Sequence, residues 1–380
     1  MRRRAWVIPF LLVAASCPGI TSETTSFSAS IERLSGPGGY FDTDNLISNE
    51  RSYLHAISDL RDAGVQGGAY LGVGPDQNFS YIAEIRPELA VIVDIRPDNV
   101  LQHLIYKALF HTSQNRLEYL ARLTGRPLPP DAADWSSASI DTILAYLDRA
   151  PVTEASRAEA MAAVEREIEG FGVRLTDAQR ATIERFHGAF IAAGPALRFR
   201  SHGRAPQFYY PTYAELLREV DREGRLVSYV STEARWRGVR ELQLADRVIP
   251  IVGDLSGDVA LAAVADLLER EDLEVSAFYT SNVEFYLFGD RTFGRFVENL
   301  RRLPLAEPSV LIKSFFRGFR GAHPLQEPGY YSTQLVQSAT DLVEGWDEGR
   351  YRTYREVVSD GLVGVSTPAT GPTPASSVPP

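Results

Sequence analysis

Two glycines and two acids at the ends of apolar runs are the residues whose types and spacing most clearly suggest chemistry. Gly72 and Gly74 end a first run, and Asp76 follows them. Backbone without a Cβ can approach a ligand closely, and the free N–H groups of a following helix attract polar ligand atoms. Asp94 closes the next run, Leu89–Val93, about twenty residues later, where an acid commonly binds a ribose diol. This spacing predicts a nucleotide-like ligand.

Two later strand ends carry polar residues of a similar kind. Asp254 follows the apolar run Val248–Val252, and Asn282 follows Val275–Tyr279. Because the carboxyl ends of parallel strands lie at one edge of a sheet, these groups are expected near the glycine turn. Glu284 would orient or deprotonate an acceptor together with Asn282.

Each of these polar residues also has a purely structural interpretation. Asn282 and Glu284 fit a helix N-terminus, where Asn caps and an early Glu meets the helix dipole. Asp254 fits a cap for a helix over 256–269, and Asp94 fits a turn before Arg96-Pro97. Both interpretations stay open at this point.

The segments between these positions predict an α/β fold with a doubly wound, mostly parallel sheet of the Rossmann type. Apolar runs for further strands occur at 226–231 and 310–314, and long helices are predicted over 100–123 and 283–300. A stretch with helical spacing only, around 131–200, predicts a helical insertion. We expect this division: 1–16 signal peptide, 17–44 linker, 45–125 first half of the Rossmann-like domain, 126–205 helical insertion, 206–325 second half, 326–365 C-terminal extension, 366–380 disordered tail.

The four strand ends together resemble the class I S-adenosylmethionine-dependent methyltransferase superfamily, over about 45–98 and 248–314. The resemblance implies that Leu71–Asp76, including Gly72 and Gly74, lies under S-adenosylmethionine and that Asp94 binds its ribose. It also implies that Asp254 lies beside the adenine and Asn282 near the methyl group.

The chain departs from the pattern of that superfamily at three places. The acid usually found two residues before the first glycine is Tyr70, and Asp76 replaces the third glycine. The resemblance therefore leaves Asp76 to contact the aminoacyl part of the cofactor. Thr280–Phe285 stands where an amino-methylation signature would lie. A methyltransferase-like protein with a small or peptide substrate is one hypothesis, and a catalytically degenerate binding or scaffold protein of the cell envelope is the other.

Other patterns are weaker. Gln77 stands where a nicotinamide-binding motif needs its third glycine, and the six histidines form no metal-ligand motif, so no metal is predicted. His103, Lys107 and His111 have helical spacing and favour a polar helix face. The aromatic run 207–213 would line an acceptor pocket or belong to the core. Asn49-Glu50-Arg51 and Arg235 are further candidates to reach a ligand carboxylate.

The composition and the first residues bear on location and partners. With 44% hydrophobic and 23% charged residues, the chain can bury a core, and its net charge of −10 argues against nucleic-acid binding. Arg2–Arg4 and the apolar run after them predict a secretory signal, whose removal leaves about −13. Export to the periplasm or cell envelope follows, with membrane attachment only through lipidation at Cys17; a start site further along would instead leave the protein cytoplasmic.

Overall fold

The protein is an α/β structure built on one six-stranded sheet. The computed structural model describes residues 26–205, 207–318 and 321–363. The strand order is β3-β2-β1-β4-β5-β6, in which β1 to β5 are parallel and β6 runs antiparallel to β5. The strands are β1 (Ala69–Gly72), β2 (Leu89–Asp94), β3 (Val248–Val252), β4 (Val275–Ser281), β5 (Leu305–Phe316) and β6 (Ser332–Ser338).

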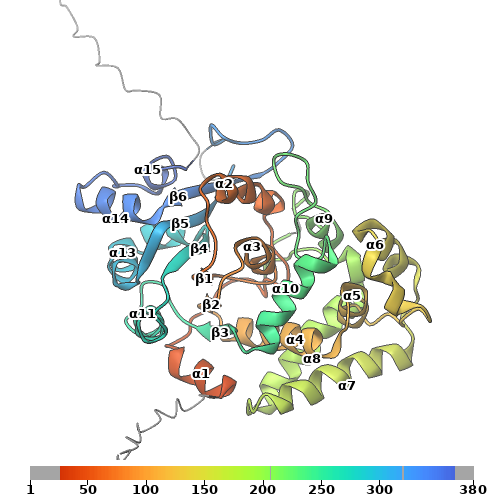
Figure 1. Ribbon diagram of the computed structural model, residues 1–380. Coiled ribbons are helices and arrows are strands. Elements are labelled where there is room, and N and C mark those ends of the chain that lie inside the picture. The colour runs from red at the N-terminus through yellow and green to blue at the C-terminus, as the bar shows by residue number, and fades with distance from the viewer. Residues whose placement is uncertain (1–25, 206, 319–320, 364–380) are drawn as a thin grey trace, which may run out of the picture.

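Helices cover both faces of this sheet. Figure 1 shows α3, α10 and α4 on one side and α11, α13 and α14 on the other. The helices are α1 (Phe27–Leu34), α2 (Ala56–Asp62), α3 (Asn78–Ile85), α4 (Pro97–Thr112), α5 (Arg116–Leu123), α6 (Ile140–Arg149), α7 (Glu154–Gly170), α8 (Asp177–Ala193), α9 (Tyr213–Leu217), α10 (Glu233–Leu244), α11 (Ala260–Glu271), α12 (Val283–Gly289), α13 (Phe293–Arg302), α14 (Ala339–Asp347) and α15 (Tyr354–Val357), with 3-10 helices η1 (Arg51–His55), η2 (Ala132–Ser137) and η3 (Gly194–Ala196).

The centre of the sheet brings the predicted strand ends together. Every residue of β1 and β2 is buried, as expected for parallel strands covered on both faces. Gly72, at the end of β1, pairs with Ile92 of β2 and with Tyr279 of β4. The chain order reverses at β1, because β2 and β3 lie on one side of it and β4 and β5 on the other. The predicted α/β class with a mostly parallel sheet is confirmed.

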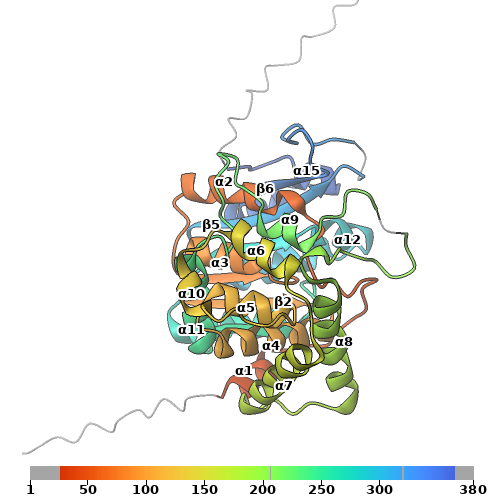
Figure 2. The same ribbon diagram turned by 90° about the vertical axis from the view of Figure 1, so that its right-hand side faces the viewer.

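The predicted insertion is helical. Residues 126–205 contain η2, α6, α7, α8 and η3, and α8 begins at a capping box between Thr176 and Gln179. α7 and α8 pack on the outer side of α4, and Figure 2 shows them together beside it. The insertion thus thickens one face of the sheet without adding a strand to it.

The amino-terminal part of the described chain covers one edge of the sheet. α1, capped by Ser26, contacts β3, and the Gly36 N–H donates to Val252 O at 2.8 Å. Residues 27–34 lie in the segment expected to be a solvated linker, yet Phe27 and Leu34 are buried. The helix has only a few apolar residues, and the segment around it is rich in Ser and Thr, so the sequence pattern did not indicate a helix here. It covers a strand edge that would otherwise be open to pairing.

Three predicted elements differ from the structure. The single helix over 100–123 is wrong: the chain breaks at 113–115, where the Asn115 side chain caps α5 and also donates to Ala132 O at 3.0 Å. The helix over 283–300 is divided into α12 and α13 by a turn containing Arg291 with φ +60°. The strand over 226–231 is absent; Leu226 forms only an isolated bridge, and Ser228 bonds the backbone of α9.

The carboxyl-terminal segment 326–365, for which the sequence suggested no elements, contains β6, α14 and α15. β6, with the sequence Ser-Thr-Gln-Leu-Val-Gln-Ser, is mostly polar but buried, and it forms the edge of the sheet beside β5. The predicted signal peptide 1–16, Cys17 and the tail 366–380 lie outside the described residues. Among the described residues, we find no helix with both the length and the hydropathy needed to cross a bilayer.

Candidate functional site

A cavity of about 510 Å³ lies at the carboxyl ends of the parallel strands. Its size falls in the range of small-molecule and cofactor sites. Its wall combines the ends of β1 to β5 with the loop before η1 and the loop after the helical insertion. The polar and glycine residues that line it include Asp42, Asn45, Glu50, Gly74, Gln77, Asp94, Arg96, Arg204, Gly253, Asp254, Ser256, Ser281, Asn282 and Asp290.

The two glycines after β1 have different tasks. Gly74 lines the cavity with φ +82°, a conformation that favours glycine, and an added Cβ would lie 3.2 Å from Gln77 Nε2. Gly72 does not line the cavity, and a Cβ there would collide with Asn78 Oδ1. Of the predicted pair, only Gly74 therefore places its backbone at the cavity, whereas Gly72 makes room for Asn78.

Two buried side chains hold the glycine turn in place. Asn78 Nδ2 donates to Val73 O at 2.9 Å and to Pro75 O at 2.7 Å, and Asn78 Oδ1 accepts from Tyr70 OH at 2.7 Å. His103 Nε2 lies 2.9 Å from Gly74 O and donates to it, because a carbonyl oxygen only accepts. Burial lowers the pKa of His103 to about 4, so the ring is neutral. The protein's own hydrogen bonds therefore hold the turn in its conformation.

The polar helix face predicted from His103, Lys107 and His111 is wrong for its first two members. Both are buried in α4, and Lys107 Nζ forms an ion pair with Asp246 at 2.7 Å. Lys107 also lies 4.4 Å from the ring of Phe27, which ties α1 to the core. Spacing alone did not distinguish an exposed polar face from a buried one.

Asp76, predicted to contact the cofactor, faces away from the cavity. Its Oδ2 accepts hydrogen bonds from Tyr213 OH at 2.8 Å and Tyr229 OH at 3.0 Å, and Asp76 does not line the cavity. Burial raises the pKa of Asp76 to about 6, and the two phenols partly offset that increase. In this structure Asp76 holds the tyrosine cluster behind the glycine turn.

Asp94 lines the cavity at the end of β2 and is paired with a neighbour. Arg96 donates from its backbone N–H (2.9 Å) and Nε (3.1 Å) to Asp94 Oδ1, and from Nη2 to Oδ2 at 2.9 Å. A carboxylate oxygen has two acceptor positions, so Oδ2 keeps one for a ligand. Arg96 in turn donates to Thr43 O at 3.4 Å, which fixes the loop that closes this side of the cavity.

Asp254 lines the cavity at the end of β3 and stabilises its own turn. Its Oδ1 accepts from the Ser256 N–H at 2.8 Å and from Ser256 Oγ at 2.9 Å. Oδ2 receives no hydrogen bond from the described residues. The helix-capping interpretation does not apply, because α11 begins at Ala260 with Val259 at its N-cap. One oxygen of Asp254 is thus available to a ligand.

The two residues predicted to be catalytic follow β4, but only one of them lines the cavity. Asn282 lines the cavity at the N-cap position of α12, but its side chain makes no capping bond. Glu284 is buried away from the cavity, where it accepts from Thr280 Oγ1 at 2.7 Å and lies 3.6 Å from Lys313 Nζ. Ser281, just before Asn282, has φ +55°, an unusual value for a residue other than glycine. Strained backbone of this kind is frequent at functional sites.

Glu50 lines the cavity, although the sequence pattern indicated it only as a further candidate. It comes from the loop before η1, is 1% exposed, and lines the cavity with Asn49. Its carboxylate accepts from Tyr279 OH at 2.6 Å, from Gln334 Nε2 at 3.2 Å and from the hydroxyls of Ser281 and Ser314. Arg51 and Arg235, which the sequence indicated together with Glu50 as candidates to reach a ligand carboxylate, do not line the cavity. Each forms an ion pair with a glutamate elsewhere.

Aromatic side chains form the outer part of the cavity. Tyr209 and Tyr210, from the predicted aromatic run, line it, and the Tyr209 ring stacks on Tyr331 with centroids 3.6 Å apart. Tyr213 of the same run is buried against Asp76, and Phe208 is 93% exposed. The run therefore divides between cavity, core and surface.

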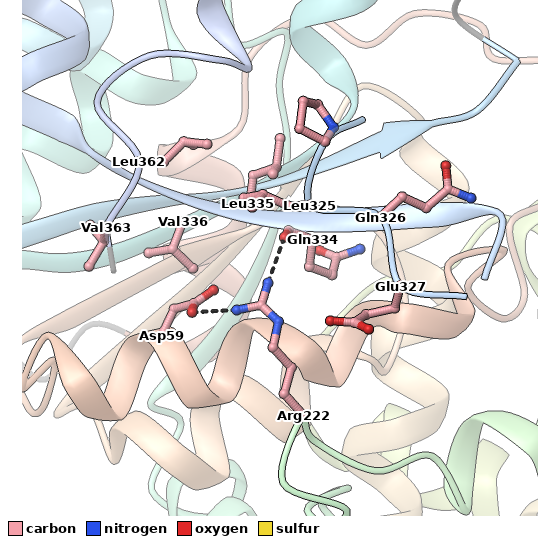
Figure 3. A pocket seen from close by; sticks show the side chains of 11 residues that line it. Asp59, Arg222, Leu325, Gln326, Glu327, Gln334, Leu335, Val336, Leu362 and Val363 are labelled. Carbon is pink, nitrogen blue, oxygen red and sulfur yellow. Dashed lines mark hydrogen bonds and ion pairs between the residues drawn. The ribbon is translucent and has the colours of Figure 1, made fainter. Parts of the chain in front are cut away.

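A second cavity, of about 380 Å³, lies beside the outer edge of β6 and contains none of the predicted site residues. Figure 3 shows Arg222 at its base, reaching both the Asp59 carboxylate of α2 and the Gln334 backbone carbonyl, which it approaches to 3.3 Å. Arg222 thus links α2 to the edge strand. Across residues 26–205, 207–318 and 321–363, we find no group of three or more His, Cys, Asp or Glu side chains placed to hold a metal ion.

The fold and the cavity define an α/β protein with a ligand-sized site at the carboxyl edge of a mostly parallel sheet. The sequence profile described as "Domain of unknown function (DUF7790)" matches residues 46–128 and 145–360, and the chain belongs to that family. The matched ranges contain Glu50, Gly74, Asp94, Asp254 and Asn282. A comparison with curated proteins gave no match.

Proposed function

We propose that the protein binds S-adenosylmethionine and is a methyltransferase-like protein acting on a small or peptide substrate. The order of β3, β2, β1, β4 and β5 is that of a Rossmann-type sheet, in which ligands bind where the chain order reverses. The larger cavity lies at that position. The arrangement supports the resemblance drawn from the strand ends.

The charge of the cavity wall is the observation that carries the proposal. Among the described residues, five acids line it, namely Asp42, Glu50, Asp94, Asp254 and Asp290, and two cations, Arg96 and Arg204. Both arginines are already paired, with Asp94 and Asp42 respectively. A nucleotide phosphate would meet these acids and no unpaired cation from the described part of the chain, whereas a sulfonium cofactor carries positive charge and no phosphate. The wall therefore favours S-adenosylmethionine over ATP or a nicotinamide dinucleotide.

Within this proposal, the available acceptor atoms have specific partners. Asp94 Oδ2 would accept from a ribose hydroxyl, and Asp254 Oδ2 from the adenine amino group. Asn282 lies at the end of β4, where the methyl group would be transferred. The sulfonium is itself a good leaving group, so the protein mainly aligns the methyl group with its acceptor and excludes water. Glu284 has no part in this reaction scheme, because it lies outside the cavity.

Titration calorimetry of the folded chain tests the proposal. We expect S-adenosylmethionine and S-adenosylhomocysteine to bind, and ATP and NADPH to bind far more weakly because of their phosphates. Binding of ATP or NADPH in preference to S-adenosylmethionine would contradict the charge argument. No binding of either adenosyl compound at millimolar concentration would overturn the proposed function.

The second candidate is a catalytically degenerate binding or scaffold protein of the cell envelope. The Arg96 pair that occupies most of Asp94, and the tyrosine in place of the usual acid at position 70, favour it. Asp94→Ala separates the two candidates, because a scaffold would keep its cellular role and a cofactor-binding protein would lose it. Cell fractionation with sequencing of the mature amino terminus tests the expected export.

A further inference from the structure

Glu50 is a buried carboxylate in the wall of the cavity without a positively charged partner. None of the ion pairs among the described residues involves it, and its hydrogen bonds come from three hydroxyl groups and one amide. Ionised carboxylates in protein interiors are usually paired with a cation, because hydroxyl donors offset only part of the lost hydration. Burial accordingly raises the pKa of Glu50. When Glu50 is ionised, the described residues therefore supply no cation to compensate its charge.

Gln77 adds an acceptor atom next to this carboxylate. Tyr279 OH donates its only proton to Glu50, so it can only accept from Gln77 Nε2, which lies 3.4 Å away. This fixes the orientation of the amide, and Gln77 Oε1 is then buried with no hydrogen-bond partner among the described residues. Gln77 is 7% exposed and lines the same cavity. A carboxylate and an orphaned carbonyl oxygen together suit a group that is positively charged and donates several hydrogen bonds.

The position of Glu50 relative to the other acids gives the direction of the ligand. Its partners belong to β4, β5 and β6, whereas Asp94 and Asp254 end β2 and β3. β1 and the glycine turn lie between the two groups. A ligand with its adenosine at Asp94 and Asp254 would cross Gly74 and direct its other end toward Glu50.

We propose that Glu50 and Gln77 form the subsite for the ammonium group of the ligand's aminoacyl end. The inference rests on the proposed function and deepens it, because it replaces the acid that is missing at Tyr70. Asp76 does not serve this purpose, because its carboxylate is held by Tyr213 and Tyr229 outside the cavity. An ammonium group offers three donors, which match Glu50 and the free oxygen of Gln77.

The test compares three thioether ligands that share the adenosine part. S-adenosylhomocysteine carries the ammonium and carboxylate groups, its decarboxylated analogue keeps only the ammonium, and 5′-methylthioadenosine has neither. We expect the wild-type protein to bind both ammonium-containing ligands more tightly than methylthioadenosine. In Glu50→Gln their affinities should fall about tenfold, while methylthioadenosine changes by less than about twofold. Gln77→Met should also weaken the two ammonium-containing ligands more than methylthioadenosine, but by a smaller factor than Glu50→Gln.

Glu284→Gln is the matched control, because Glu284 is equally buried but lies outside the cavity. The substitution removes the carboxylate next to the buried Lys313, so it should lower thermal stability. The variant should still bind both ammonium-containing ligands more tightly than methylthioadenosine, as the wild type does. Equal weakening of all three ligands in Glu50→Gln, or wild-type discrimination retained there, would overturn the inference and leave the proposed function standing. Equal wild-type affinity for the three ligands would also overturn it. If wild-type protein binds none of them, the proposed function fails.

Discussion

Glu50 and Asp76 are two buried carboxylates with similar local chemistry and different positions relative to the cavity. Both accept hydrogen bonds from tyrosine hydroxyls, and no ion pair among the described residues includes either of them. Asp76 is enclosed by Tyr213 and Tyr229, whereas Glu50 forms part of the cavity wall. Residue type, burial and hydroxyl partners therefore do not distinguish a ligand-binding acid from a structural one. Access to the cavity does.

The largest effect that tests this comparison is expected from Asp76→Asn. The folded-state pKa of Asp76, about 6, lies above its usual value of 3.8, so the folded protein binds the proton more tightly than the unfolded chain. The wild-type free energy of unfolding should therefore decrease as the pH rises from about 4 to about 6. A pKa difference of about 2 corresponds to a change of about 3 kcal/mol in the free energy of unfolding. Asp76→Asn should abolish this pH-dependent change. Urea unfolding of both proteins across this pH range measures the difference.

The same variant sharpens the contrast with Glu50. Asp76→Asn should bind 5′-methylthioadenosine and S-adenosylhomocysteine as the wild type does, because Asp76 does not reach the cavity. A loss of discrimination between these ligands in Asp76→Asn would mean that the tyrosine cluster takes part in binding. A pH-independent difference in stability would mean that burial does not raise the pKa of Asp76 in the folded protein.

The glycine turn joins the two regions, and its glycines should respond differently to alanine. Gly72→Ala forces Asn78 to move and to break bonds with the turn, which should cost about 2–3 kcal/mol of stability. Gly74→Ala places alanine at φ +82°, with a cost of about 1–2 kcal/mol, and narrows the cavity beside Gln77. Thermal unfolding should therefore show the larger loss of stability in Gly72→Ala, and ligand titration the larger loss of affinity in Gly74→Ala. The same ranking in both experiments would contradict the assignment of Gly72 to the core side.

The sequence predicted the parts of this site that depend on local pattern. Buried apolar runs placed the strands, and the acids after them placed Asp94 and Asp254 at the cavity. Asp76 and Glu284, which were expected at the ligand, do not line the cavity, because the direction of a side chain near a helix start depends on what packs around it. Glu50 was only a weak candidate, since its hydroxyl and amide partners lie 229 to 284 positions along the chain. β6, which supplies one of them, has too mixed a pattern to be recognised as a strand.

The smallest effect is expected from Asp94→Asn, and it extends the comparison to an acid that has a cationic partner. Asp94 lines the cavity, but Arg96 already occupies three of its four acceptor positions. Loss of the remaining position should weaken 5′-methylthioadenosine by about tenfold, because a single charge-assisted hydrogen bond contributes about 1.5–3 kcal/mol and Asn keeps part of it. Asp98→Asn, in the same segment but outside the cavity, should leave this affinity unchanged. If Asp94→Asn binds as tightly as the wild type, the acid serves only to hold Arg96, and Asp94 belongs with Asp76 among the structural carboxylates.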